Sequence, residues 1–173
     1  MAAIICDTRQ QAGKHEHVDR WFERHGVDFE YRKLDFGDYM TEGSNVSVDT
    51  KKDMAELASN LGKDHARFVR ECERARSVGH RLIILVEAGD RYNDAAEVAR
   101  WLSPVCLRCR RCNPREAATR CTRFKRKPMQ GRQLLSIMSG MEKNHGVWFS
   151  FCDRRKTART ICELLGVAYE PTE

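Results

Sequence analysis

A run of five apolar residues, from Leu82 to Val86, constrains the fold of this chain more than any other feature. In a β-strand, successive side chains point to opposite faces of the sheet. A strand that is apolar at every position must therefore be covered on both faces, which is typical of a central strand between two layers of helices. We expect an α/β protein with this strand in the middle of its sheet.

The rest of the chain supplies the helices and strands that this architecture needs. Alternating apolar patterns predict strands at 3–7, 29–34, 46–50 and 147–152. Helical periodicity predicts helices near 18–25, 53–61, 64–78, 94–102, 134–141 and 158–165, the second opened by a capping box of Asp53 and Glu56. We expect one domain spanning 1–173, with a central mixed β-sheet flanked by helices and a cysteine-rich basic insert at about 104–128.

The sequence shows neither a transmembrane segment nor a secretory signal peptide. No apolar run is long enough to span a bilayer. The first ten residues, MAAIICDTRQ, lack the basic and apolar regions of a signal peptide. We expect a cytoplasmic protein without a membrane partner.

The stretch from Gly37 to Leu57 holds the strongest candidate for chemistry. Asp49 and Lys51 are two apart on a predicted strand, so they share one face of the sheet. A hairpin that turns at Gly43 would bring Asp38 alongside them. Two neighbouring carboxylates repel each other, and a hard divalent cation such as Mg²⁺ or Mn²⁺ relieves the repulsion. The alternative is that these are ordinary polar residues on a solvent-facing strand and in a turn.

Four segments in this order resemble a known family. They are ICDTRQ (5–10), GDY (37–39), VDTKKDMAEL (48–57) and LIILVE (82–87). The Gly-Asp and Asp-x-Lys pair is similar to the PD-(D/E)xK signature of restriction-endonuclease-like nucleases. The whole order resembles the nuclease domain of xeroderma pigmentosum group F (XPF-type) endonucleases, in particular small single-domain versions from phages and bacteria. The resemblance is firm from Ile4 to Glu87 and extends more loosely to Leu165.

The resemblance implies a restriction-endonuclease-like fold and a Mg²⁺- or Mn²⁺-dependent DNA endonuclease that prefers branched, flap or junction DNA and leaves a 3′-hydroxyl. By the same resemblance, Asp38 and Asp49 are metal ligands, Lys51 assists the attacking water, and Asp7 lies near the metal. The resemblance also implies that the backbone carbonyl of Thr50 is a further ligand. Asp49 stands where the family has glutamate and Thr50 where it has arginine. A homodimer is also consistent with the family.

All of the excess positive charge lies in one segment. Residues 105–127 contain nine Lys or Arg and one acid, a net charge of +8, whereas the whole chain carries +6. Such a segment is typical of a surface that binds nucleic acid, although a solvated basic loop is the plainer alternative. The residues that we expect to contact DNA are Arg108, Arg110, Arg111, Arg123, Lys125, Arg126 and Lys127.

Four of the eight cysteines lie in the same segment. Cys106, Cys109, Cys112 and Cys121 follow a C-x2-C-x2-C-x8-C spacing. Tetrahedral thiolate coordination suits one structural Zn²⁺. An iron–sulfur cluster and the absence of any metal are the two alternatives.

Two functions therefore remain open on the sequence alone. The first is a metal-dependent DNA endonuclease that uses Asp7, Asp38, Asp49 and Lys51. The second is a non-catalytic, zinc-stabilised nucleic-acid-binding module on a degenerate nuclease fold. The complete set of two acids and a lysine favours the first.

Overall fold

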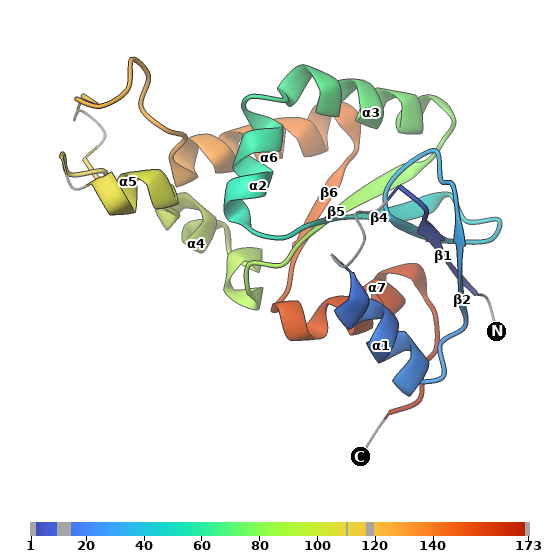
Figure 1. The fold of residues 1–173 in the computed structure, drawn as a ribbon. Coiled ribbons are helices and arrows are strands. Elements are labelled where there is room, and N and C mark those ends of the chain that lie inside the picture. Colours follow the sequence, from blue (N-terminus) through green and yellow to red (C-terminus); the bar gives the residue numbers. More distant parts are fainter. Residues whose placement is uncertain (1–2, 10–14, 110, 117–119, 172–173) are drawn as a thin grey trace.

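A computed structural model describes residues 3–9, 15–109, 111–116 and 120–171 of the chain. Its centre is a six-stranded sheet in the order β2-β1-β3-β4-β5-β6 (Figure 1). The strands are β1 (Ile4–Asp7), β2 (Phe29–Arg32), β3 (Tyr39–Thr41), β4 (Val46–Lys51), β5 (Arg81–Val86) and β6 (Trp148–Phe151). Only β3 runs antiparallel to its two neighbours, so the sheet is mixed.

Helices cover both faces of the sheet (Figure 1). One face carries α1 (Glu16–Arg24) and α7 (Thr157–Leu165). The other carries α2 (Met54–Leu61), α3 (His65–Ser77) and α6 (Gly131–His145). Side chains of β5 alternate between the two cores: Ile83 and Leu85 pack with α1 and α7, whereas Leu82, Ile84 and Val86 pack with the other three helices. The predicted α/β class is confirmed. β5 is covered by helices on both faces as expected, but it lies next to the edge strand β6 rather than in the middle of the sheet.

The segment between β5 and α6 extends away from the sheet (Figure 1). It contains the 3₁₀ turn η1 (Asp90–Asn93), α4 (Ala95–Arg100) and α5 (Pro104–Cys109). Outside this segment, a second 3₁₀ turn, η2 (Arg154–Lys156), lies between β6 and α7. The sequence pattern did not predict α5, because six residues are too few to show helical periodicity. Cys106 is buried and anchors this short helix.

Parallel strands bring distant residues to one edge of the sheet. β1, β4, β5 and β6 all end at this edge, and β3 begins there. We call it the carboxyl edge. It gathers Asp7, Asp38, the end of β4 and Glu87, although these residues are spread over 80 positions of the sequence.

The helices are short relative to a bilayer. Within the described part of the chain, no helix combines the length and the apolar character needed to cross a membrane.

Candidate active site at the carboxyl edge

Asp49 and Lys51 form a buried ion pair on β4. The Lys51 Nζ lies 2.6 Å from Asp49 Oδ2, and each residue is only 8% exposed. Burial opposes the charge of Lys51, but the carboxylate of Asp49, assisted by Asp38 and Glu56, raises the pKa of the ammonium above its usual value. The side chain of Lys51 therefore stays protonated and positively charged. The alternative of solvent-facing strand residues is wrong for this pair.

The predicted hairpin places Asp38 beside β4. Tyr39 pairs with Val48, and the Asp38 backbone N–H donates to the Val48 carbonyl at 2.8 Å. The Asp38 Oδ2 accepts two hydrogen bonds from Thr50, one from its N–H at 2.8 Å and one from its hydroxyl at 2.5 Å. Thr50 is 2% exposed, so its hydroxyl, where the family has arginine, fixes the neighbouring acid rather than facing solvent.

Asp7 organises the backbone next to Asp38. Its Oδ2 accepts from Arg9 Nε at 2.8 Å, and its Oδ1 accepts from the backbone N–H of Leu34 at 3.2 Å. The Asp7 N–H donates to the Asp38 carbonyl at 2.8 Å. The carboxylate thus holds Arg9 and the β2–β3 connection, while the Arg9 side chain remains 56% exposed at the carboxyl edge.

Glu87 and His17 join the site from other parts of the chain. Glu87 follows β5, and its N–H donates to the Lys51 carbonyl at 2.8 Å. Its side chain is 7% exposed, with Oε1 3.1 Å from His17 Nε2 and 2.9 Å from the Thr157 hydroxyl. Arg154 Nε lies 3.7 Å from its other oxygen. The position of Glu87 after an apolar strand is the only sequence signal for this cluster, since nothing in the sequence links it to His17.

A further acid, Glu71 of α3, lies near the ion pair. Burial raises the pKa of the Glu71 carboxyl, and the charge of Asp49 raises it further, against the opposing effect of Lys51. The sequence analysis did not single out Glu71. The sequence signal that could have identified Glu71 is its position next to Cys72, a residue of the buried stripe of α3.

The donors at the carboxyl edge are compatible with a hard divalent cation. Among the described residues, no three His, Cys, Asp or Glu side chains gather closely enough to hold a metal ion by themselves. Mg²⁺ is usually bound by only one or two carboxylates, with water and substrate phosphates as its other ligands. Asp38, directly before β3, and Asp49, on β4, supply that number, and oxygen donors are the type that Mg²⁺ and Mn²⁺ prefer.

The basic insert presents most of its cations to solvent. Arg108, Arg111, Arg123, Lys125 and Arg126 are exposed, and Lys127 is half-buried with its Nζ donating to the Glu116 carbonyl at 2.9 Å. Arg110 lies outside the described residues. The guanidinium of Arg123 lies over the exposed ring of Phe124, 5.1 Å from its centroid. A solvent-facing basic surface is available to a polyanion.

The four cysteines of the insert are thiols without a disulfide. Cys106 is buried, and burial raises its pKa, with a smaller contribution from the nearby thiols of Cys112 and Cys121. Backbone N–H groups of Phe124 and Arg123 lower the pKa of Cys121. These side chains do not form a ready metal cluster in the described structure.

A six-stranded mixed sheet between helical layers, with two acids and a lysine at its carboxyl edge, defines a restriction-endonuclease-like α/β protein. The family model of the ERCC4 domain matches residues 6–162. The chain belongs to this family, which is the family of XPF-type nucleases that act on DNA. The predicted family and fold are confirmed. No curated protein matches the chain.

Proposed function

We propose that this protein is a Mg²⁺- or Mn²⁺-dependent endonuclease that hydrolyses phosphodiester bonds in branched, flap or junction DNA. One observation supports it most: Asp38, the residue directly before β3, lies beside β4 and its buried pair of Asp49 and Lys51, all at one edge of the sheet. A purely structural ion pair does not require a second carboxylate beside it.

In this mechanism, Asp38, Asp49 and the backbone carbonyl of Thr50 would hold the divalent cation. A bound divalent cation polarises a phosphoryl oxygen and lowers the pKa of a bound water. Lys51 keeps its proton, because the acids around it raise its pKa. Its ammonium then orients the attacking water and stabilises the negative charge that develops on the phosphate.

Asp7 and Glu87 act as positioning residues. Asp7 fixes the backbone of Asp38 and holds Arg9, whose exposed guanidinium is available to a phosphate next to the cut. Glu87 fixes the end of β4 through the Lys51 carbonyl. Water attacks phosphorus, and the bond to the 3′ oxygen breaks, so the products are a 3′-hydroxyl and a 5′-phosphate.

A substrate panel tests the proposal. Purified protein with Mg²⁺ or Mn²⁺ is given fork, flap, junction, nicked and blunt duplex DNA, alongside the variant Asp49→Asn. Asp28→Asn, an exposed residue before β2, is the matched control for loss of one carboxylate. We expect cleavage of the branched substrates by wild type and by Asp28→Asn, and loss of at least about 100-fold in Asp49→Asn. If Asp49→Asn cleaves DNA as well as wild type, the assignment of the active site to these residues is wrong.

We also propose that Cys106, Cys109, Cys112 and Cys121 bind one structural Zn²⁺. Their C-x2-C-x2-C-x8-C spacing supports it. Metal analysis of the purified protein is the test: we expect about one zinc per chain, lost in Cys109→Ser. A metal-free preparation that is folded, or one that contains iron, rules out the zinc site. Salt-sensitive DNA binding without cleavage under any divalent ion would instead indicate the non-catalytic binding module.

A further inference from the structure

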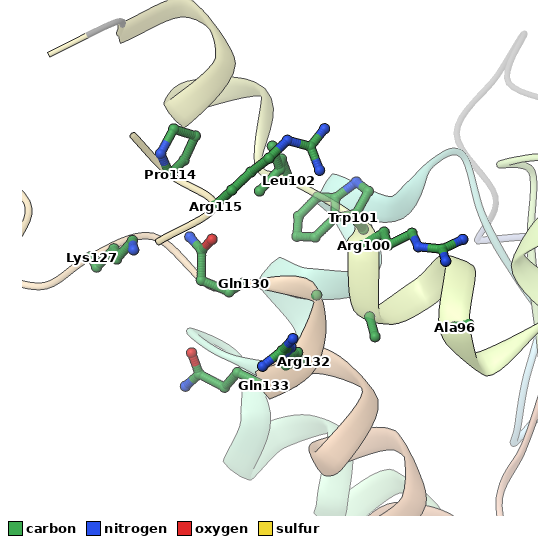
Figure 2. Close-up of a pocket in the computed structure, with 12 residues that line it drawn as sticks. Ala96, Arg100, Trp101, Leu102, Pro114, Arg115, Lys127, Gln130, Arg132 and Gln133 are labelled. Carbon is green, nitrogen blue, oxygen red and sulfur yellow. The ribbon is translucent and has the colours of Figure 1, made fainter. Parts of the chain in front are cut away.

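Two adjoining cavities lie between α4, the basic insert and the start of α6. The first encloses about 480 Å³ and the second about 400 Å³. They share four lining residues, Arg100, Trp101, Leu102 and Arg115, so they adjoin, and we call the two together the α4 groove. Figure 2 shows the first cavity, with side chains of the insert on one side and of α6 on the other.

The lining of the α4 groove is strongly basic. It contains five cations, Arg91, Arg100, Arg115, Lys127 and Arg132, and a single acid, Glu97. Glu97 is already paired with Arg100, at 2.5 Å between Oε1 and Nη1. Arg91, Arg115 and Arg132 come from three separate segments, η1, the insert and α6, and all three are exposed. A net charge of +4 in a concave site selects an anionic ligand.

The floor of the groove is fixed by backbone contacts. The Gly131 N–H donates to the Trp101 carbonyl at 3.0 Å, and Leu102 and Gln130 form an antiparallel bridge. A Cβ on Gly131 would lie 2.2 Å from the Val98 carbonyl oxygen, so α6 approaches α4 as closely as glycine allows. The backbone that carries these cations is therefore fixed before a ligand binds, which lowers the entropy cost of binding.

The groove leads toward the candidate active site. Its second cavity ends on Arg91 and Tyr92 of η1, which follows the carboxyl end of β5. α6 precedes β6, which is parallel to β5, so the first turn of α6 also lies toward the carboxyl edge. The groove therefore lies toward the same edge of the sheet as Asp49 and Lys51.

We infer that the α4 groove binds a single-stranded arm of the DNA substrate. Cavities of this size hold individual nucleotides, whereas a rigid duplex can only lie across their rims. Proteins that bind single strands combine cations for the backbone with aromatic and apolar surfaces for bases. The exposed side chain of Leu107 supplies an apolar surface beside the arginines, whereas Trp101 and Tyr92 line the groove but are each only 9% exposed. The inference deepens the proposed function, because a branched substrate provides such an arm.

Binding without catalysis provides the first test. Fluorescence anisotropy without added Mg²⁺ or Mn²⁺, and without a chelator that would remove zinc from the insert, measures the affinity for a labelled oligothymidylate of about 12 nucleotides, and separately for a blunt duplex. The test variant is Arg115→Ala/Arg132→Ala. The matched control, Arg24→Ala/Lys143→Ala, removes two exposed charges from the last turns of α1 and α6.

Counterion release sets the expected size of the effect. Each single-strand phosphate contact contributes about 0.7 to the slope of log K against log salt, so the groove variant loses about 1.4 of that slope. At 0.1 M salt this is roughly a 25-fold weaker affinity for the single strand. We expect a smaller change for the duplex, and little change in the control variant. An unchanged single-strand affinity, or equal losses for both DNAs or both variants, overturns the inference.

A cleavage assay separates this inference from the proposed function. With Mg²⁺, the groove variant should lose cleavage of a flap substrate at low DNA concentration and regain it at saturating concentration, because Asp49 and Lys51 are untouched. If wild type binds the single strand through the groove but never cuts, the groove stands and the endonuclease proposal fails. If wild type cuts and the groove variant shows the same concentration dependence, the endonuclease stands and the groove inference fails.

Discussion

Replacing Gly131 with alanine tests the contact that joins α6 to α4. The added Cβ would meet the Val98 carbonyl oxygen at 2.2 Å and the Ala99 oxygen at 2.7 Å, both backbone atoms that no side-chain rotation can move away. One helix end must therefore shift by about 1 Å, and overpacking of this kind costs roughly 1–3 kcal/mol. Alanine recovers only part of the roughly 0.5–1 kcal/mol that it gains over glycine inside a helix, because residue 131 is the first residue of α6. We expect a net loss of about 1–2 kcal/mol.

Gly140, in the same helix, supplies the matched control. A Cβ there meets no atom within 4 Å, so Gly140→Ala gains helix propensity without a clash and should stabilise the protein by roughly 0.5–1 kcal/mol. Urea unfolding measures both free energies, and thermal unfolding should show Gly131→Ala lower by about 2–8 °C. The reasoning is refuted if Gly131→Ala unfolds with the same free energy as wild type, or if both variants shift in the same direction.

Three further substitutions test contacts at the carboxyl edge and at α2, each by urea unfolding. Thr50→Val keeps the shape of the side chain but removes the hydroxyl that donates to Asp38, and should cost about 1.5–3 kcal/mol, whereas Thr50→Ser should lose less; equal losses contradict a role for the hydroxyl. Asp53→Ala removes the N-cap that accepts from the Glu56 N–H and should cost about 1 kcal/mol, while Asp53→Asn should change little; a similar loss in both points away from capping. Glu87→Gln removes the buried charge that accepts from His17 and Thr157 and pairs with Arg154, and should cost about 1.5–3 kcal/mol; an unchanged unfolding curve would show that those contacts do not stabilise the fold.

The elements were predictable where their pattern is local. The apolar run of β5, the stripe of α3 and the capping box at Asp53 each depend on residues a few positions apart, and the structure confirms the elements they mark. The helix α5 was missed because its six residues lie among cysteines and arginines that show no period. Whether the cysteines bind zinc and whether the insert binds DNA stay predictions.

The sequence by itself determined that Asp49 and Lys51 share a face, because alternation along a strand needs no partner. It also determined the hairpin that brings Asp38 beside them, since Gly43 and the flanking strands are close in the chain. Only the tertiary structure decided that the pair is buried, that Thr50 holds Asp38, and that His17 meets Glu87 across 70 residues. The Thr50 contact depends on strand pairing, whereas the burial of the pair, the His17 contact and the α4 groove depend on how helices pack against the sheet and against one another. That long-range packing is encoded by no local period.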